Sequence, residues 1–362
     1  MSMKHYIYIT LAIALSIVTA CTEHPIVQVP QVPESSRSYI FFEPEVVDNK
    51  ATKATFVEGD HLPAGSTEAP SAFGVIGYYN GKSIFDGYEN SIAEVYRKGE
   101  NTSFQYDVLA WWRDRDADAT TKHNFFAFYP YSIKENVVPN NGNPYISYNL
   151  PTSEADMEDI LTAYKSTARV PSVQIVFQHR LWALDVEVVN RQTGDGYSQP
   201  GVGTLTPPDL HIVSVKLTLE GIPDKGTLAI DGNLTSTVTS RKPTQEYTLH
   251  ARTATIVKVP TDNPETEEKE NTASFGPLLF LPTPVSYTDE NGANKTVSYK
   301  LDFTFKNHWG VEYTQSFPLS AFKTSFEPGK RYKLTVVKTD TKASVELKVA
   351  TWSTENVTHT FQ

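Results

Sequence analysis

The residue of this chain best placed for covalent chemistry is Cys21, the only cysteine in 362 residues. It follows the small residues Thr19 and Ala20, at the end of an uncharged and mostly apolar run that begins at Tyr6. A thiol in this position is what the bacterial lipoprotein pathway requires, because a diacylglycerol is attached to the sulfur before the chain is cut between Ala20 and Cys21. The sequence therefore predicts a lipoprotein signal peptide over residues 1–20. The alternative is a free cysteine behind an ordinary signal peptide.

The predicted lipid on Cys21 is the only membrane attachment visible in the sequence. The run from Tyr6 to Ala20 is shorter than the roughly 20 apolar residues that a spanning helix needs, and no other long apolar run follows. Residues 21–37 hold three prolines among polar residues, which predicts a tether between the lipid and the folded chain. Without a second cysteine no disulfide can form, so a large buried core must supply the stability.

Two further groups of residues have the chemistry of metal ligands. The segment DRDADA (114–119) places aspartates at alternating positions, as a calcium-binding loop does, and they are Asp114, Asp116 and Asp118. It ends in alanine where that loop needs glycine, and Phe125 stands where the loop needs a bidentate glutamate, so we expect a solvated hairpin tip. His179 lies among apolar neighbours with no metal ligand at suitable spacing, which favours a core or edge histidine.

Aromatic residues gather at Trp111–Trp112 and in FFAFYPY (125–131). Together with Trp309, the two tryptophans could form a stacking platform for sugars. Packing within a core and between strands is favoured over this platform, because aromatic residues are common in strands.

Neither the motifs nor the composition favours an enzyme or a nucleic-acid-binding protein. No G-x-S-x-G, H-E-x-x-H or phosphate-binding glycine loop occurs, so we expect neither catalysis nor a cofactor. The formal net charge of −10 and the absence of a basic cluster argue against nucleic acid, whose binding depends on Lys and Arg.

The composition and the spacing of turn residues predict an all-β chain. A helix is expected only at 153–164, where Ser153 can cap a first turn that is rich in acids. The Gly- and Pro-rich stretch 191–210 is the best domain boundary, which predicts two β-sandwiches over 38–190 and 211–362 joined by a linker. The expected strands are 38–47, 72–80, 103–112, 123–131, 144–150, 172–190 (two strands or one bent strand), 212–222, 226–232, 247–259, 276–282, 297–305, 311–319, 331–339 and 344–352.

Six short pieces occur in an order that resembles the fimbrillin-like family, the lipoprotein-derived pilus subunits of Gram-negative anaerobes. The pieces are SYIFFEPEVVDNKATKATFVEGD, FGVIGYYN, HNFFAFYPY, ADMEDILTAY, VFQHRLWALDVEV and SFEPGKRYKLTV with the later Trp352. Each is short, but the ordered set behind a lipidation signal is specific and covers nearly all of the mature chain. The resemblance implies two transthyretin-like β-sandwich domains, lipid-dependent export and polymerisation on the outer membrane by strand exchange.

In the mechanism that the resemblance implies, the first strand is a placeholder. A protease cuts behind it, the strand leaves, and a strand of the next subunit fills the hydrophobic groove. The placeholder residues here would be Tyr39, Ile40, Phe41, Phe42, Val46 and Val47. Their loss would leave apolar surface and unpaired backbone groups, which is an edge ready for a partner strand. The expected donor is the C-terminal stretch 346–362, in which Val357, His359 and Phe361 point the same way.

The expected cleavage site departs from the family pattern. Where the family often has an arginine after the first strand, this chain has Lys50 and Lys53. Cleavage at Arg37 would leave the strand attached. Either a protease that accepts lysine acts at Lys50 or Lys53, or the subunit stays uncut and anchors or terminates the filament. The bland alternative is that both lysines are ordinary loop residues.

Two functions follow from these observations. The leading one is a structural subunit, stalk or tip, of fimbriae attached to the outer membrane, with other fimbrial subunits as partners and a role in adhesion and biofilm formation. The alternative is a monomeric glycan-binding surface lipoprotein that uses Trp111, Trp112 and Trp309. In either case the chain is placed at the outer membrane or on the cell surface, and its sequence identifies no receptor.

Overall fold

A computed structural model describes the parts of the chain that carry the strands. Chain contacts separate Met1–Ser38 from a compact unit, Tyr39–Gln362, to which all the strands below belong. The described residues are 38–46, 62–63, 71–97, 103–113, 121–190, 198–199, 203–204, 211–249, 253–255, 271–284, 286–306, 312–318, 325–338, 343–351 and 357–361.

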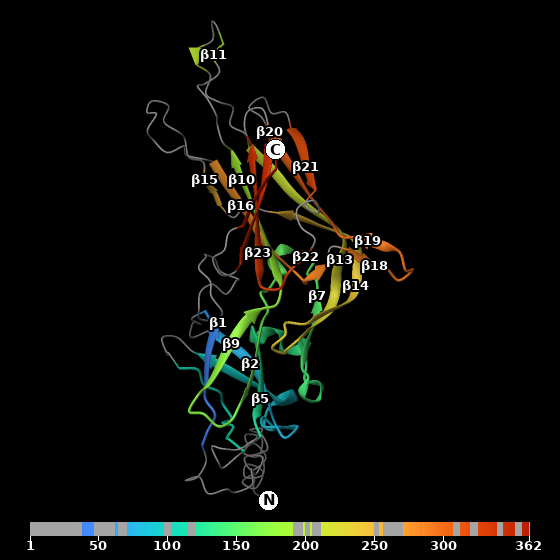
Figure 1. Cartoon of the computed structure of the whole chain (residues 1–362). Helices are drawn as coiled ribbons and strands as arrows, with labels where there is room; N and C mark the ends of the chain where they lie inside the picture. The colour runs from blue at the N-terminus through green and yellow to red at the C-terminus, as the bar shows by residue number, and fades with distance from the viewer. Residues whose placement is uncertain are drawn as a thin grey trace, which may run out of the picture. The chain divides into compact units, whose positions relative to one another are not determined.

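The first sheet has the order β1-β9-β8-β5-β2-β3, with β4 beside β2. Figure 1 labels four of its strands, β1, β9, β2 and β5. Its pairs are antiparallel except β1 with β9, which is parallel. Its strands are β1 (Phe42–Val46), β2 (Ser71–Tyr79), β3 (Lys82–Ser83), β4 (Ile92–Arg97), β5 (His123–Tyr129), β8 (Leu161–Thr167) and β9 (Val173–His179).

Two further large sheets are built mainly from the second half of the chain. The second has the order β15-β16-β10-β23-β24-β25, made of β15 (Thr253–Thr255), β16 (Asn271–Phe280), β10 (Trp182–Asn190), β23 (Lys330–Lys338), β24 (Ala343–Thr351) and β25 (Val357–Phe361). The third has the order β21-β20-β13-β7-β6, with β14 beside β13, made of β21 (Glu312–Pro318), β20 (Ser298–Lys306), β13 (His211–Ala229), β7 (Tyr145–Asn149), β6 (Val137–Val138) and β14 (Ser236–Leu249).

Short elements complete the described part of the chain. The two-stranded pairs are β11 (Ser198–Gln199) with β12 (Gly203–Thr204), β17 (Thr283–Pro284) with β22 (Ser325–Phe326), and β18 (Ser286–Thr288) with β19 (Asn294–Thr296). The helices among the described residues are all single 3-10 segments, namely η2 (Glu89–Ser91), η3 (Tyr131–Asn136), η4 (Asn140–Gly142) and η5 (Glu154–Asp156). The predicted all-β fold class is thereby confirmed.

The first sheet is buried on both faces over much of its area. One face carries Phe73 and Phe125 and packs into a cluster that we call the N-terminal core, which also holds β1 and β9 side chains. The opposite face carries Phe126 and Phe128 and packs into a larger cluster, the central core, which is shared with the second and third sheets. Consecutive aromatic residues of one strand therefore serve two different cores, because side chains alternate across a strand.

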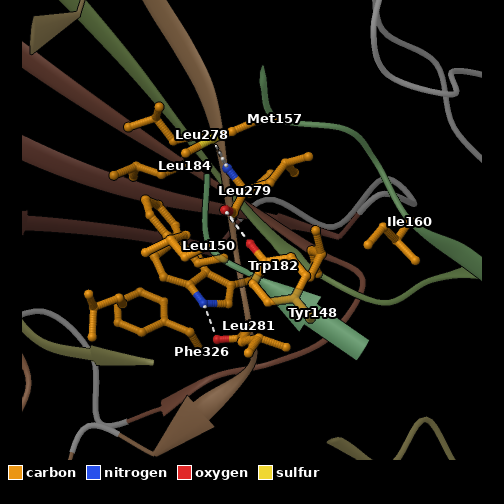
Figure 2. Close-up of a cluster of buried hydrophobic side chains, with 14 of the residues drawn as sticks. Tyr148, Leu150, Met157, Ile160, Trp182, Leu184, Leu278, Leu279, Leu281 and Phe326 are labelled. Atoms are coloured by element: carbon orange, nitrogen blue, oxygen red, sulfur yellow. Dashed lines mark hydrogen bonds between the residues drawn. The ribbon is translucent and has the colours of Figure 1, made fainter. Parts of the chain in front are cut away.

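Trp182, at the start of β10, lies at the middle of the central core (Figure 2). Its ring is fully buried, and the ring centroids of Phe326 and Phe280 lie 4.2 and 4.7 Å from its own. Its Nε1 donates a hydrogen bond of 3.0 Å to the carbonyl oxygen of Leu281. The indole thus contributes both a large apolar area and a satisfied polar group.

Gly74 in β2 shows how closely the sheet packs against its neighbours. A Cβ atom at this position would lie 2.1 Å from Cζ of Phe128, so any side chain would displace that ring. The absence of a side chain at Gly74 is therefore required for the close approach of the Phe128 ring from β5 to β2.

Most of the expected strands are confirmed, and three expectations were wrong. Residues 103–112 do not form a strand but make isolated bridges, Tyr96 with Gln105 and Tyr39 with Trp111. The helix expected at 153–164 is limited to η5, in which the Ser153 hydroxyl accepts a hydrogen bond from the Ala155 amide as a cap, and the chain then enters β8. The strands expected at 212–222 and 226–232 are one strand, β13.

The division into domains at 191–210 stays a prediction, and the strand pairing bears on where a boundary would fall. β7 pairs with β13, and β10 pairs with β16 and β23, although β7 and β10 both precede residue 191. The second and third sheets therefore draw strands from both sides of the expected linker.

Removing the indole of Trp182 is expected to destabilise the fold strongly. We predict that Trp182→Ala lowers the free energy of unfolding by about 3–5 kcal/mol, because a buried aromatic ring leaves a cavity and an unpaired carbonyl. Urea denaturation of the mature chain measures the change. Trp111→Ala is the matched control, since Trp111 is only half-buried, and it should cost about 1 kcal/mol. Equal losses for the two variants would contradict the placement of Trp182.

Candidate functional site

The edge strand β1 is held to the first sheet by one ladder. It pairs in parallel with β9, from Phe42 opposite Val173 to Val46 opposite Phe177. The Val173 amide donates a hydrogen bond of 2.8 Å to the Phe41 carbonyl, and the Gln174 side-chain amide donates to the Glu43 carboxylate. Among the described strands, β1 has no ladder partner on its other side.

The side chains of β1 alternate between the N-terminal core and solvent. Ile40, Phe42 and Val46 are at most 4% exposed, whereas Phe41 is 50% exposed. The Phe42 ring packs against two other aromatic rings, with its centroid 5.5 Å from that of Phe125 and 5.8 Å from that of Tyr106. Glu43 and Glu45 point to solvent with Phe41, so the strand has one apolar and one mixed face.

The segment 103–113 closes over the start of β1. The Ile40 amide donates a hydrogen bond of 3.0 Å to the Ala110 carbonyl, and the Tyr106 hydroxyl donates one of 2.5 Å to the Ile40 carbonyl. Burial raises the pKa of Tyr106 well above its usual value of 10, so its hydroxyl stays a neutral donor. This segment, which we expected to be a strand, instead supplies hydrogen bonds to the residues just before β1.

The apolar side chains in and just before β1 are deeply buried, although the strand itself lies at the edge of its sheet. Burying Ile40, Phe42 and Val46 contributes about 1.5–3 kcal/mol for each side chain, which is a large share of a typical domain's stability. Yet β1 lies at an edge and close to the N-terminal end of the chain, so no other described strand would have to move for it to leave. Its departure would expose the β9 edge and the rings around Phe42, which is a groove suited to an apolar strand.

The C-terminal strand β25 also lies at a sheet edge. It pairs antiparallel with β24, from Val357 opposite Val349 to Phe361 opposite Val345. Val357, His359 and Phe361 occupy alternating positions of this strand. The structure places these three residues in one strand, and their role as a donor stays a prediction.

Several of the expected site residues lie outside the described residues. These are Ala20, Cys21, Val47, Lys50 and Lys53, together with the three aspartates of 114–119 and Trp309. No group of three or more metal-ligating side chains occurs within the described ranges. Over the same ranges, no helix has the length and hydrophobicity that a membrane crossing requires.

The aromatic residues weighed as a sugar platform belong largely to the cores. Trp112 is 4% exposed, and its ring packs edge-on against His123 at 4.8 Å and Phe125 at 6.0 Å. Trp111 is half-buried, with the Arg113 guanidinium 4.2 Å from its ring centroid. The preference for packing over sugar stacking is confirmed for Trp112 and for the buried phenylalanines of β5.

His179 is a buried core histidine, as the sequence favoured. Its Nδ1 lies 2.9 Å from a carboxylate oxygen of Asp159, and both side chains are at most 3% exposed. Sequence reasoning missed Asp159 as its partner, because the two residues are 20 positions apart and meet through the antiparallel pairing of β8 with β9, in which Leu161 lies opposite His179.

Sequence reasoning also missed Arg180, which is fully buried. Its Nη1 donates hydrogen bonds to the Thr162 hydroxyl (2.9 Å) and the Ala229 carbonyl (2.6 Å), and its Nη2 donates to the Thr235 carbonyl (2.7 Å). Burial lowers the pKa of Arg180 to about 10, so the guanidinium stays charged at neutral pH. Arg180 thereby joins β8 of the first sheet to the β13–β14 hairpin of the third.

Comparisons with known proteins identify a family for this chain and solved structures with a similar fold. The model of the fimbrillin-like family matches residues 52–352. A candidate cell adhesion protein from Bacteroides uniformis has a similar solved structure, with 18% identity and a TM-score of 0.50, and the match covers 88% of this chain and 100% of that one. No curated protein matches this sequence.

Two other solved structures are more distant. A candidate cell adhesion protein from Bacteroides ovatus has 15% identity and a TM-score of 0.48, over 88% of this chain and 99% of that one. The tip fimbrial protein Mfa3 from Porphyromonas gingivalis, with a C-terminal truncation, has 10% identity and a TM-score of 0.41, over 87% of this chain and 100% of that one.

The chain belongs to the fimbrillin-like family, because the family model spans most of its length. The match begins at residue 52, after β1, and ends one residue beyond β24, so both edge strands of the candidate site lie outside it. Membership places the protein among the structural proteins of cell-surface fimbriae.

The alternation of β1 gives a matched pair of substitutions. We predict that Phe42→Ala lowers the free energy of unfolding by about 3–5 kcal/mol, because it removes a ring from the N-terminal core. Phe41→Ala, one residue earlier and half exposed, should change it by less than about 1 kcal/mol. Urea midpoints of the two variants check this, and a larger loss for Phe41→Ala would show that β1 is placed in the opposite register.

Proposed function

We propose that this protein is a stalk or tip subunit of fimbriae on the outer membrane and that it is assembled by donor-strand exchange. In this proposal β1 is a placeholder that fills the groove along β9 until the subunit is incorporated. A strand of the next subunit then replaces it. The observation that carries the proposal is the position of Phe42, which lies deep in the N-terminal core while its strand is attached to the sheet by a single ladder.

The segments on either side of β1 are suited to removal of this strand by cleavage. On the N-terminal side lie the tether of residues 21–37 and the proposed lipid attachment at Cys21, which would hold the precursor at the outer membrane. On the C-terminal side, Lys50 and Lys53 are the proposed cleavage positions. A cut at either lysine would detach β1 together with the tether and the lipid, so that processing frees the groove and releases the subunit from its anchor in one step.

The spacing of apolar residues supports β25 as the donor. In β1, Phe42 stands four residues before Val46. In β25 the order is reversed, because Phe361 stands four residues after Val357. A donor that runs opposite to β1 would place Phe361 at the depth of Phe42 and Val357 at the depth of Val46. It would also pair antiparallel with β9, and antiparallel ladders are slightly more stable per residue than the parallel ladder they would replace. This difference favours exchange over return of the placeholder.

The exchange can be tested with the mature chain carrying an engineered cleavage site between residues 47 and 54. After cleavage and release of β1, a fluorescent peptide of residues 352–362 is expected to bind saturably by fluorescence polarisation. The uncut chain should not bind, because β1 occupies the groove. Binding to both forms alike, or to neither, would contradict the proposal.

The same assay distinguishes the two faces of the donor. A peptide with Phe361→Ala should bind about tenfold to a hundredfold more weakly, because burial of the ring contributes about 1.5–3 kcal/mol. Thr360→Ala, which alters the opposite face of the strand, is the matched control and should bind as the unaltered peptide does. Equal losses would mean that the peptide does not occupy the groove as a strand.

A further inference from the structure

A second feature, separate from β1, has the form of a binding site. A groove of about 150 Å³ lies between η3, β7 and the segment that contains η5, and Leu279 of β16 forms part of its floor. None of its lining residues belongs to β1 or β9, so its role does not depend on strand exchange.

The floor of the groove is apolar, and its residues are joined by hydrogen bonds. Tyr148, Met157 and Leu279 are all at most 6% exposed. The Leu279 amide donates a hydrogen bond of 3.1 Å to the Met157 sulfur, and the Tyr148 hydroxyl donates one of 3.5 Å to the Leu279 carbonyl (Figure 2). Ile133 and Ile146 extend the same apolar surface from η3 and β7.

The rim of the groove is polar and carries negative charge. Asp156 in η5 and Glu158 just after it are exposed, and so are the lining residues Asn136 of η3 and Ser147 and Asn149 of β7. Among the described residues that line the groove there is no lysine, arginine or histidine. Lys134, on the neighbouring η3, is directed elsewhere, with its Nζ 5.5 Å from the Tyr131 ring centroid and 3.8 Å from Glu135. Ser132 donates a hydrogen bond of 3.4 Å to Glu158, and the Glu158 side chain is exposed.

These properties select one ligand chemistry. An anion would be repelled by Asp156 and Glu158, and a sugar would find little ring surface to stack on, since Tyr148 is only 6% exposed. A lysyl or arginyl side chain matches both parts of the groove, because its aliphatic stem can lie on the apolar floor while its charged head reaches the carboxylates. The volume of the groove suits a single side chain and is below that of typical small-molecule sites.

We propose that this groove is a docking pocket for one basic side chain, lysine or arginine, presented by a protein partner of the fimbrial subunit. Asp156 and Glu158 bind the charged head, and Met157, Ile133 and Ile146 contact the stem. The partner is recognised through charge complementarity with two exposed carboxylates above an apolar floor.

Met157 provides a direct probe of this pocket. The chain holds three methionines, at positions 1, 3 and 157, so a chain from residue 22 onward that is freed of its starting methionine has only Met157. Labelling of the methionine methyl group with ¹³C then gives a single resonance from the pocket floor. Titration with Nα-acetyl-lysinamide is expected to shift this resonance saturably, and Nα-acetyl-argininamide is expected to do the same. The doubly substituted variant Asp156→Asn/Glu158→Gln should bind about tenfold more weakly.

Two controls make the test decisive. Asp86→Asn/Glu89→Gln removes two exposed carboxylates that do not line the groove, and it should leave the titration unchanged. Lysinamide acetylated on its side-chain nitrogen has the stem but no charge, and it should produce no saturable shift. The absence of any shift with the charged probe would overturn the proposal, and so would equal binding of the acetylated probe or an unchanged affinity in the Asp156→Asn/Glu158→Gln variant. Strand exchange would be unaffected by these outcomes.

Discussion

The arrangement of this protein depends on how one edge strand fills the N-terminal core. Phe42 is buried among Phe85, Tyr106 and Phe125, at a depth that is usual for a central strand. The strand that carries it nevertheless has a ladder on one side only and contains Pro44, which lacks an amide hydrogen to donate. Its side chains are therefore needed for the core, whereas its backbone is only loosely tied to the sheet. A strand whose side chains fill the core but whose backbone pairs on one side only can be replaced by another strand with matching side chains.

The rest of the structure is held together by contacts that do not involve β1. The first sheet is buried on its second face by the central core, through Phe126 and Phe128. Arg180 links that sheet to the β13–β14 hairpin through three hydrogen bonds to neutral acceptors. Trp182 then begins the strand around which the second sheet is built. These contacts are independent of β1, so the groove along β9 belongs to a framework that is held together elsewhere.

Local patterns in the sequence predict the strands well where side chains alternate over a full ladder, as in 72–80 and 123–131. They predict the wrong element where alternating or capping residues do not belong to a full ladder or helix. Alternation at 103–112 places Tyr106, Ala110 and Trp112 in the core, but the segment makes only isolated bridges. Ser153 caps a single turn, because pairing of Leu161–Thr167 with β5 prevails over helix propensity. The burial of Arg180 could not be predicted, since its acceptors at Ala229 and Thr235 lie 49 and 55 residues away.

The most direct test of the exchangeable first strand is the mass and N-terminus of the protein in fimbriae isolated from cells. The proposed mechanism predicts a chain that starts after Lys50 or Lys53, without lipid and without β1. A chain in the filament that still starts at lipidated Cys21 and retains Phe42 would contradict it. Such a chain would instead be an anchored subunit whose first strand is a permanent part of the fold.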